Sequence, residues 1–378
     1  MKTNKMVNFG NGKKVLNFLI AAGGTGGHLF PAMAVGEKLK QLSDVEINLY
    51  FIGTENRMES RIVPEQGYEY FPMPIYGFAG LSLKSLKLPL NILKSIKIAK
   101  RVIKDKKIDG VIVAGAYLSY PPGVAAYKSG IPLFLMESNV NLGKSNKALS
   151  KKATKIFTSY KETEGYIDKS LHSRVFQYGN PMRDFILDLP ETDKAKEFFK
   201  LDFNKNTVLI IGGSLGARSI NQVIEKNLEG LGGSSWQFIW QTGRNYQPPS
   251  EIPNNIVCTQ FIDDMSSAYS VADIIVSRSG ATATAEICLV GKPSILIPLS
   301  SASNNEQYYN GKVIAENGGA ILIEDGDLES RLMEELEQLM GDEKMRSELS
   351  VNAKKLGKPN AARDVAREIL KTYSENIR

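Results

Sequence analysis

The chain has 378 residues, of which 42% are hydrophobic and 23% charged, and its formal net charge is +6. A chain of this length is too long for one ordinary core and predicts two domains of about 150 to 200 residues each. No apolar run reaches the roughly 18 residues that span a bilayer, which argues against an integral membrane protein. The two cysteines, Cys258 and Cys288, have neither metal-ligand nor redox spacing, so we expect a protein of a reducing cytoplasm.

The first half of the chain alternates short β-branched runs with helical periodicity. The apolar run 15–22 imitates a secretory leader, but it continues into a glycine cluster and therefore predicts a buried first strand. Four further strands are predicted at 47–53, 110–115, 132–137 and 155–159.

A strongly basic stretch lies between the predicted strands 47–53 and 110–115. Residues 81–109 hold nine Lys or Arg against two Asp, a local net charge of +7, so the rest of the chain sums to −1. Leucine and lysine without interleaved aromatics favour an anionic membrane surface over nucleic acid. The side chains expected to insert or to bind headgroups in the segment 75–90 are Phe78, Leu81, Leu83, Leu86 and Leu88, with Lys84 and Lys87.

A helix is predicted at 90–107, within the same stretch. Its apolar positions Ile92, Ile96, Ala99 and Ile103 fall on one face, which we expect to pack on a sheet. The alternative to membrane binding is a crossover helix whose basic residues simply face water. Those basic residues are Lys94, Lys97, Arg101 and Lys104.

The second half of the chain repeats the scheme of the first. Strands are predicted at 207–213, 237–243, 255–261, 272–280 and 293–299, and LIIGGSLGAR at 209–218 echoes LIAAGGTGGH at 19–28. This alternation predicts an α/β protein of two similar doubly wound domains. We place the boundary near 178–193 and expect the last helix, after GKPNAARDVAREIL, to return to the first domain.

Each glycine loop follows a buried strand and precedes a helix, which suits a phosphate or diphosphate because backbone N–H groups and a helix dipole converge there. The dinucleotide fingerprint fails, since Leu29 stands at the third glycine position and the second strand ends without an acidic residue. No P-loop signature is present either. The alternative is that the glycines only permit tight strand-to-helix packing.

A third strand-to-helix turn has the same character. In ADIIVSRSGATATAEI, residues 272–287, small residues would let the backbone embrace a sugar or phosphate. Glu286 could accept hydrogen bonds from the vicinal hydroxyls of a ribose. Alternatively, Glu286 is a first-turn acid that interacts with the helix dipole.

Five motifs together resemble one family. They are GGTGGHLFPAMAV, GNPMR, GGSLGAR, FIDDM and SRSGATATAEI, and they occur in the order and spacing of the MurG family of peptidoglycan glycosyltransferases. The resemblance runs from about residue 14 to the C-terminus and includes GTENRMES. It implies two Rossmann-like domains facing a cleft, the GT-B arrangement. Residues 1–182, with the helix 361–378, would face acceptor and membrane, and residues 183–360 would bind the UDP-sugar.

The resemblance also implies site residues. Ser214 and neighbouring amides would hold the diphosphate, Ile262 would meet uracil through its backbone, and Glu286 would bind ribose. Gln307 would offer an amide to the sugar hydroxyls, while its neighbour Glu306 departs from the family pattern. The backbone lining phosphates and sugar would be that of Ala281, Thr282, Ala283, Thr284 and Ala285. From the first domain, the donor sugar or reacting centre would be reached by Thr25, Gly26, Gly27 and Asn139, with Arg183 from the boundary.

Departures from the family lie on the acceptor side. The glycine-rich segment reads GAYLSYPPGV here, with Ala116, Tyr120 and Pro122 at glycine positions. The segment that reads HEQN in the family reads MESN, with Met136 and Ser138. These changes affect the expected fit of the acceptor more than that of the donor.

Glycosyl transfer requires a base for the acceptor hydroxyl and a stabilised leaving group. His28 is one of only two histidines and directly follows the glycine loop, where it could take the acceptor proton or, alternatively, orient backbone or phosphate. EDGD at 324–327 imitates a metal-binding Asp-x-Asp, but its position before LESRLMEELEQL predicts a turn and a helix start. Loop amides and a helix end can meet the leaving charge, so we expect neither metal nor cofactor.

The expected activity is therefore inverting transfer of N-acetylglucosamine from UDP-N-acetylglucosamine to a lipid-linked N-acetylmuramyl-pentapeptide. Two rivals stay open: a UDP-sugar-dependent diacylglycerol glycosyltransferase, and a non-catalytic sugar-nucleotide binding protein. We expect peripheral attachment to the cytoplasmic face of the bacterial plasma membrane and no nucleic-acid partner.

Overall fold

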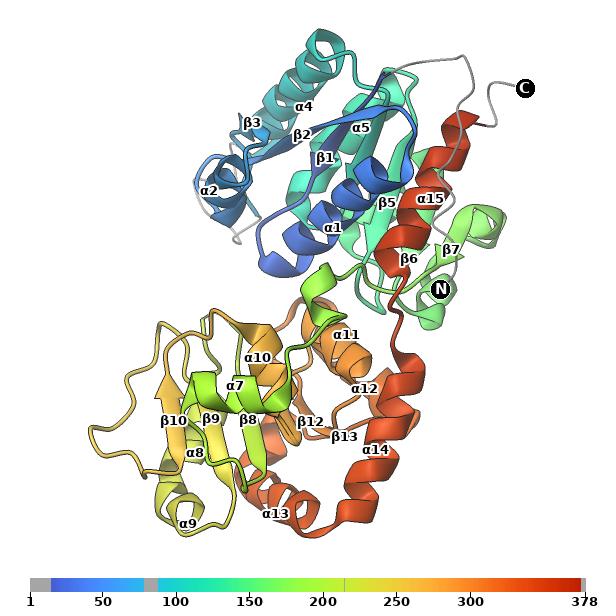
Figure 1. The fold of residues 1–378 in the computed structure, drawn as a ribbon. Helices are drawn as coiled ribbons and strands as arrows, with labels where there is room; N and C mark the ends of the chain where they lie inside the picture. Colours follow the sequence, from blue (N-terminus) through green and yellow to red (C-terminus); the bar gives the residue numbers. More distant parts are fainter. Residues whose placement is uncertain (1–14, 78–87, 214, 375–378) are drawn as a thin grey trace. The chain divides into compact units, whose positions relative to one another are not determined.

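The computed structural model describes residues 15–77, 88–213 and 215–374, which form two compact units, each with its own sheet (Figure 1). Unit 1 comprises Met1–Arg183 and Pro359–Arg378, and unit 2 comprises Asp184–Lys358. The predicted division after residue 182 differs from this one by a single residue.

Unit 1 contains a seven-stranded sheet in the order β3-β2-β1-β4-β5-β6-β7, and every neighbouring pair is parallel. The order reverses between β1 and β4, and in such sheets ligands bind at the carboxyl ends of the strands beside that point. The strands are β1 (Val15–Ala21), β2 (Glu46–Thr54), β3 (Glu69–Met73), β4 (Gly110–Val113), β5 (Leu133–Glu137), β6 (Lys155–Thr158) and β7 (Val175–Gln177).

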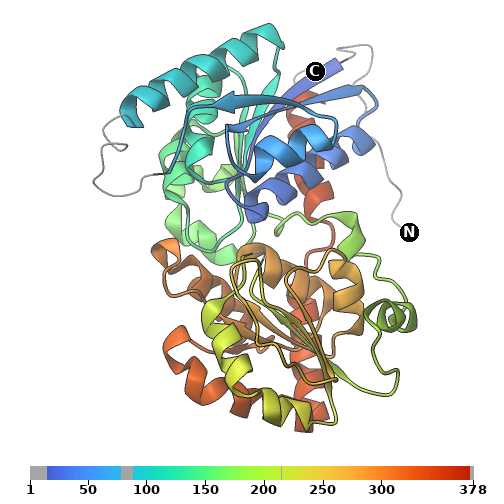
Figure 2. The same ribbon diagram turned by 90° about the vertical axis from the view of Figure 1, so that its left-hand side faces the viewer.

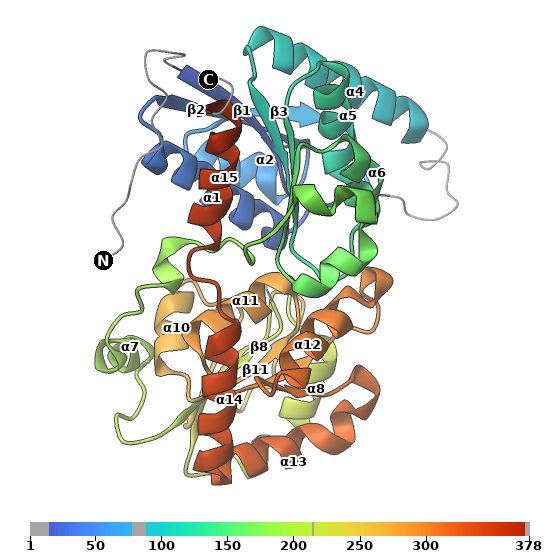
Figure 3. The ribbon, with the colours of Figure 1, turned by 90° about the vertical axis from the view of Figure 1, so that its right-hand side faces the viewer.

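Helices cover both faces of this sheet. Phe18 and Ile20 of β1 pack in one core with α1 and α15, whereas Leu19 and Ala21 pack in a second core with α4 and α5. Figure 3 shows α1 and α15 on one side of the sheet and α4, α5 and α6 on the other. Burial on both faces explains why β1 reads as a continuous apolar run. The helices are α1 (Gly26–Leu42), α2 (Met58–Glu65), α4 (Leu88–Asp105), α5 (Tyr120–Lys128), α6 (Lys144–Leu149) and α15 (Ala361–Ser374).

The predicted basic helix exists as α4, the teal helix on the outside of unit 1 in Figure 2. Its bounds are Leu88–Asp105 rather than 90–107. The prediction for its packing face is confirmed, because Ala99 and Ile103 are buried and Ile92 and Ile96 pack against the same core. Most of the residues that we expected at a membrane lie outside the described residues: Phe78, Leu81, Leu83, Lys84, Leu86 and Lys87.

Unit 2 contains a six-stranded parallel sheet in the order β10-β9-β8-β11-β12-β13, which reverses between β8 and β11. The strands are β8 (Thr207–Ile211), β9 (Gln237–Gln241), β10 (Ile256–Thr259), β11 (Ile274–Arg278), β12 (Ser294–Ile297) and β13 (Ile321–Leu322). The helices are α7 (Thr192–Phe199), α8 (Arg218–Lys226), α9 (Leu228–Gly232), α10 (Met265–Val271), α11 (Ala281–Val290), α12 (Glu306–Glu316), α13 (Leu328–Gly341) and α14 (Glu343–Leu356).

The α/β class and the parallel sheets are confirmed, but three strands escaped the sequence analysis. These are β3, β7 and β13, each at a sheet edge. Edge strands are short and only partly covered, so they lack the continuous apolar signal of central strands. Among the described residues, no helix combines the length and apolarity needed to cross a membrane.

Candidate active site

The glycine loop of unit 1 follows β1 at the point where the strand order reverses. Gly24 adopts the left-handed φ of +80°, and its N–H donates to Oε2 of Glu59 at 2.9 Å. A Cβ atom on Gly23 would lie 2.4 Å from Cδ of Glu59, so only glycine fits there. The side chain that approaches this backbone is thus a buried glutamate of the protein itself. For Gly23, the alternative that the glycine only permits tight packing is therefore correct.

Glu59 lies in the first turn of α2, within the GTENRMES motif, and is fully buried. Its other oxygen, Oε1, accepts from the Thr54 hydroxyl at 2.6 Å and the Thr54 N–H at 3.2 Å. One carboxylate therefore joins the glycine loop to the end of β2. Because the carboxylate lies against the loop, its charge disfavours a phosphate beside Gly24, and the phosphate role predicted for this loop is weakened there.

His28 lies in the first turn of α1 immediately after this loop. Its Nδ1 is 3.1 Å from the Thr25 hydroxyl, which fixes the ring orientation. Burial lowers the pKa of His28 to about 4, although part of the ring surface stays accessible, so the imidazole is neutral at pH 7. A neutral imidazole can accept a proton, as the predicted base must.

The opposite side of the His28 ring meets the loop after β4. A Cβ atom on Gly115, whose φ is +77°, would lie 3.2 Å from Nε2 of His28. The next residue, Ala116, has φ +57° and ψ 169°, a region that glycine occupies readily and other residues avoid. The departure from the family glycine at this position therefore leaves a strained alanine beside His28. The other two departures from family glycines lie in α5: Tyr120 is its first residue, and Pro122 is buried in it.

Asn139 follows β5 at the same edge of the sheet, and a buried carboxylate holds it. Oε1 of Glu137 accepts from the Asn139 N–H at 3.0 Å, and Oε2 accepts from the side-chain amide of Asn146 at 2.9 Å. Burial raises the pKa of Glu137 more than these hydrogen bonds lower it. Met136, which departs from the family histidine, is a core residue at 3% exposure and belongs to the same hydrophobic cluster as α1 and α15.

Arg183 belongs to unit 1 rather than to unit 2, where its sequence position had placed it. Its guanidinium carbon lies 4.1 Å from the ring centroid of Phe30, which is on α1. Unit 1 thus gathers Thr25, Gly26, Gly27 and His28 on one segment, with Asn139 and Arg183 on two others.

The glycine loop of unit 2 follows β8. Gly216 has φ +82°, and a Cβ atom there would lie 2.0 Å from the carbonyl oxygen of Thr242, so this glycine permits close contact with the loop after β9. The predicted diphosphate ligand Ser214 lies outside the described residues.

Gln241, which the sequence analysis missed, links two predicted donor-binding segments. Its Nε2 donates to the carbonyl of Gly213 at 2.9 Å, and its Oε1 accepts from the N–H of Ile262 at 3.1 Å. The Ile262 amide is therefore already paired with a side chain, which leaves the carbonyl oxygen as the group available for a base. Gln241 ends β9 in the motif QTG, but an amide at a strand end carries no signal specific enough for recognition.

The third predicted turn is the start of α11 after β11. Gly280 is the N-cap, and the first-turn amides of Ala281, Thr282 and Ala283 project toward the carboxyl edge of the sheet. The hydroxyl of Thr284 donates a hydrogen bond to the Gly280 carbonyl at 3.1 Å. Ala285 completes the segment, and Glu286 follows it. The alternative interpretation of Glu286 as a first-turn acid is wrong, because the first turn of α11 holds no acidic residue.

Glu286 is partly exposed and accepts a hydrogen bond from the hydroxyl of Tyr269 at 2.9 Å. Tyr269 is fully buried on α10, and burial followed by the charge of Glu286 raises its pKa well above the usual range. The tyrosine hydroxyl therefore stays protonated and acts as the donor.

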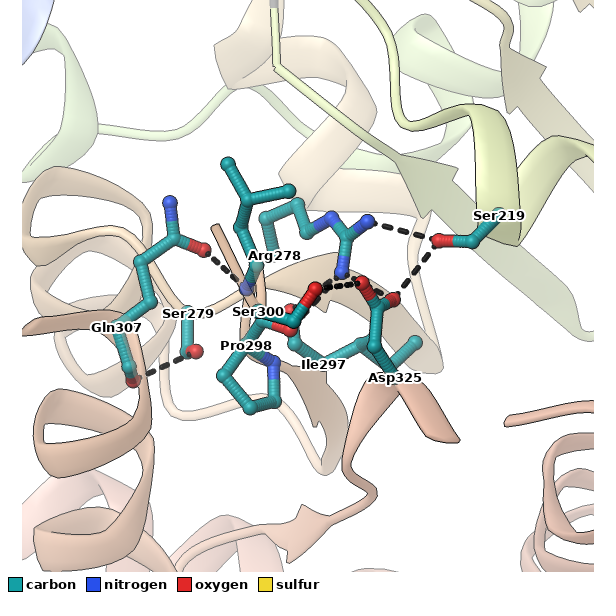
Figure 4. A network of polar contacts seen from close by, with 9 residues as sticks. Ser219, Arg278, Ser279, Ile297, Pro298, Ser300, Gln307 and Asp325 are labelled. Carbon is teal, nitrogen blue, oxygen red and sulfur yellow. Dashed lines mark hydrogen bonds and ion pairs between the residues drawn. The ribbon is translucent and has the colours of Figure 1, made fainter. Parts of the chain in front are cut away.

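A network around Arg278 joins the loops at the carboxyl edge of unit 2 (Figure 4). The guanidinium donates to Asp325 at 2.9 Å, to Ser219 at 2.8 Å and to the carbonyl of Pro298 at 3.1 Å. Burial acts to raise the pKa of Asp325, but hydrogen bonds from Arg278, Ser219 and Ser300 outweigh it and hold the pKa below its usual value. The ends of β11 and β12, the start of α8 and the 3-10 turn Asp325–Asp327 are thereby fixed together.

Gln307 of α12 joins the same edge. Its Oε1 accepts from the N–H of Leu299 at 3.0 Å, and its carbonyl accepts from the Ser279 hydroxyl at 2.8 Å, as Figure 4 shows for Ser279. The orientation leaves the amide nitrogen to donate, which suits a sugar hydroxyl. Glu306 precedes it as the first residue of α12.

The EDGD sequence forms the turn that was predicted, followed by α13. Its Asp325 is paired with Arg278 rather than with another carboxylate. Within the described ranges, no group of three or more His, Cys, Asp or Glu side chains could hold a metal ion.

Comparison with known proteins shows matches along most of the chain. The sequence model of the glycosyltransferase family 28 N-terminal domain matches residues 18–158, and that of the family 28 C-terminal domain matches residues 207–368. A curated relative from Flavobacterium psychrophilum is 36% identical over 359 residues, 94% of this chain and 97% of the relative. A relative from Bacteroides thetaiotaomicron is 35% identical over 370 residues, 95% of this chain and 98% of the relative. Both are named UDP-N-acetylglucosamine--N-acetylmuramyl-(pentapeptide) pyrophosphoryl-undecaprenol N-acetylglucosamine transferase.

Solved structures agree with these matches. The crystal structure of Acinetobacter baumannii MurG superposes with a TM-score of 0.73 at 27% identity and covers 95% of this chain and 100% of that chain. A UDP-GlcNAc 2-epimerase from Neisseria meningitidis shares the fold, with a TM-score of 0.65 at 14% identity over 94% of this chain and 100% of that chain. Two Rossmann-like units that match the two family 28 domain models define a glycosyltransferase of the GT-B class. The chain belongs to glycosyltransferase family 28 and, within it, to the MurG family.

Proposed function

We propose that the protein transfers N-acetylglucosamine from UDP-N-acetylglucosamine to a lipid-linked N-acetylmuramyl-pentapeptide. The observation that carries this proposal is the composition of the carboxyl edge of unit 2. The Ile262 carbonyl follows β10, the Glu286 carboxylate and the N-terminus of α11 follow β11, and the Gln307 amide follows β12 of the same sheet. These groups suit a base, a ribose, a diphosphate and a sugar respectively.

The chemistry would be a direct displacement. A muramyl hydroxyl oxygen bonds to the anomeric carbon of N-acetylglucosamine, the bond from that carbon to the diphosphate breaks, and the proton passes to Nε2 of His28. In the tautomer that donates its Nδ1–H to the Thr25 hydroxyl, Nε2 would carry the lone pair that takes the proton. The leaving UDP would be stabilised by the amides at the start of α11 and in the loop 212–217.

His28 has a low proton affinity in the ligand-free protein because it is buried. An anionic diphosphate close to the ring would raise that affinity during the reaction, because an opposite charge favours the imidazolium form. The predicted roles of Thr25, Gly26, Gly27, Asn139 and Arg183 near the reacting centre are part of this proposal.

Turnover with defined acceptors tests the proposal. Purified protein is incubated with UDP-N-acetylglucosamine and either the lipid-linked muramyl acceptor or diacylglycerol, and UDP release is measured. We expect release only with the muramyl acceptor. Release only with diacylglycerol would identify a lipid glycosyltransferase, and donor binding without release would identify a binding protein.

Two variants separate the roles of donor binding and catalysis. Glu286→Ala should weaken UDP binding by about 1.5–3 kcal/mol, because it removes a charge-assisted hydrogen bond. His28→Ala should lower turnover while UDP affinity stays nearly unchanged. Unchanged UDP affinity in Glu286→Ala, measured by calorimetry, would refute the ribose role. Equal losses of turnover and affinity in His28→Ala would instead favour an orienting histidine.

We further propose that unit 1 binds an anionic membrane surface at the cytoplasmic face of the plasma membrane through α4. This helix carries five Lys or Arg against one Asp, and Lys94, Lys97 and Lys104 are exposed. Leu90 and Leu93 are 62% and 63% exposed beside them, which supports shallow insertion. The combination of exposed leucines with lysines favours lipid over nucleic acid.

A charge-matched pair of variants tests this attachment. Lys94→Glu with Lys97→Glu should weaken binding to vesicles containing phosphatidylglycerol by at least about thirtyfold, since each lysine contributes about 1 kcal/mol. Lys194→Glu with Lys344→Glu in unit 2 changes the net charge equally and should leave vesicle binding intact. Equal effects of the two pairs would mean that α4 is only a solvated face.

A further inference from the structure

Tyr269 and Glu286 come from different helices of unit 2 and meet in one hydrogen bond. The tyrosine is on α10, and the glutamate is on α11 after the turn that follows β11. Tyr269 has no exposed surface, and its hydroxyl oxygen lies 2.9 Å from Oε2 of Glu286. A buried donor is therefore directed at the carboxylate to which we assign the ribose.

The tyrosine is held by a helix that is itself fixed at several points. Asp264 caps α10, because its Oδ1 accepts from the Ser267 N–H at 3.1 Å and its Oδ2 accepts from the Ser267 hydroxyl at 2.6 Å. Further along, the Ser270 hydroxyl donates to the carbonyl of Pro190 at 2.8 Å. Tyr269 is thus a rigid donor and not a mobile side chain that follows its partner.

Glutamate alone is a poor recognition group because three side-chain torsions let it sample many positions. A fixed donor selects one arrangement before the ligand arrives, which removes part of the ordering cost of binding. The two oxygens of a carboxylate can accept about four hydrogen bonds. The hydrogen bond from Tyr269 takes up only one of these acceptor positions.

We propose that Tyr269 is a positioning residue that orients Glu286 for the ribose and so sets the preference for ribonucleotide over deoxyribonucleotide donors. The proposal rests on the proposed function, specifically on the ribose role of Glu286. Tyr269 does not touch the ligand. It acts through the carboxylate, so its removal should affect only those ligands that carry the hydroxyl which Glu286 binds.

The experiment compares dissociation constants of UDP and 2′-deoxy-UDP, measured by calorimetry, in four forms of the full chain. In the wild type we expect 2′-deoxy-UDP to bind about ten- to a hundredfold more weakly than UDP, as for a lost hydrogen bond to a charged group. In Glu286→Ala this ratio should fall to about one. In Tyr269→Phe it should fall at least threefold from the wild-type value, because UDP loses affinity for both hydroxyl contacts whereas 2′-deoxy-UDP has only one of them to lose.

Tyr246→Phe is the matched control. It removes a tyrosine hydroxyl that donates to a glutamate of the same unit, Glu225, and should leave the ratio unchanged. Under turnover, Tyr269→Phe should raise the KM for UDP-N-acetylglucosamine with kcat unchanged, because a ribose contact is made equally in the ground and transition states.

The outcomes are distinct. A wild-type ratio in Glu286→Ala would refute the ribose role and with it that part of the proposed function. If the ratio of dissociation constants falls to about one in Glu286→Ala but keeps its wild-type value in Tyr269→Phe, the positioning role alone is overturned. Equal weakening of both ligands with a lowered melting temperature would mean that Tyr269 only supports the fold. Tyr269→Met, which fills similar space without a hydroxyl, supplies the same comparison if the phenylalanine variant does not fold.

Discussion

The protonation of His28 offers the most direct check of the site geometry. Burial lowers its pKa from the ordinary value of 6.5 to about 4. A shift of this size corresponds to about 3 kcal/mol disfavouring the imidazolium form, and the accessible part of the ring makes this an upper value. At pH 7 only about one molecule in a thousand would carry the proton.

The sign of the stability effect follows from the two pKa values. The pKa of His28 is lower in the folded chain than in the unfolded chain. Between pH 6.5 and 4 the unfolded chain therefore binds a proton at His28 that the folded chain does not bind. The stability of unit 1 should therefore fall as the pH drops through this window and stop changing from this cause below pH 4. At pH 5 the loss should be about 2 kcal/mol relative to pH 7.5.

Two measurements test these values. Nuclear magnetic resonance of a His172→Gln variant leaves one histidine, whose ring protons should titrate with a midpoint near 4. Urea unfolding of the wild type and of His28→Gln is measured at pH 7.5 and pH 5. The free energy of unfolding should fall by about 2 kcal/mol more in the wild type than in the variant. A midpoint near 6.5, or parallel pH dependence of the two proteins, would refute the burial argument.

Three further predictions concern other parts of the site. Gly115→Ala should lower kcat by about a hundredfold without changing the Kd for UDP, because a Cβ atom 3.2 Å from Nε2 would displace the His28 ring. An unchanged kcat would show that the position of this ring does not matter for turnover. Ala116→Gly should raise the free energy of unfolding by about 1 kcal/mol because it relieves backbone strain, and a decrease in a urea titration would contradict this. Asp325→Asn should lower the free energy of unfolding of unit 2 by about 3 kcal/mol, since it leaves the buried Arg278 charge unpaired, whereas an effect below about 1 kcal/mol would mean that solvent already screens the pair.

Much of the fold follows from patterns that are local in the sequence. Nine central strands and the edge strand β10 were predicted from apolar runs. Central strands give this signal because both faces of the sheet are covered, as at β1, and the two glycine loops indicated two similar units. The family was recognisable because several short motifs keep their order over the whole chain. Edge strands such as β7 were missed because three residues with one covered face give little periodic signal.

Roles that depend on pairing across the fold were beyond the sequence. Glu59 is far in the chain from Gly24, and nothing local indicates that its carboxylate occupies the glycine loop. Tyr269 lies in a short run of residues, 267–271, that carries no motif, and only the tertiary structure brings its hydroxyl to Glu286.

The sequence by itself determined the class, most of the strands, the family and the candidate ligand-binding segments, because apolar periodicity and glycine turns are properties of neighbouring residues. The tertiary structure decided which polar group each of those segments meets. It paired Asp325, in the turn that the sequence had predicted, with Arg278, and it paired Gln241 with the Ile262 amide. Buried polar groups must find partners when water is removed, and those partners lie on segments that only folding brings together.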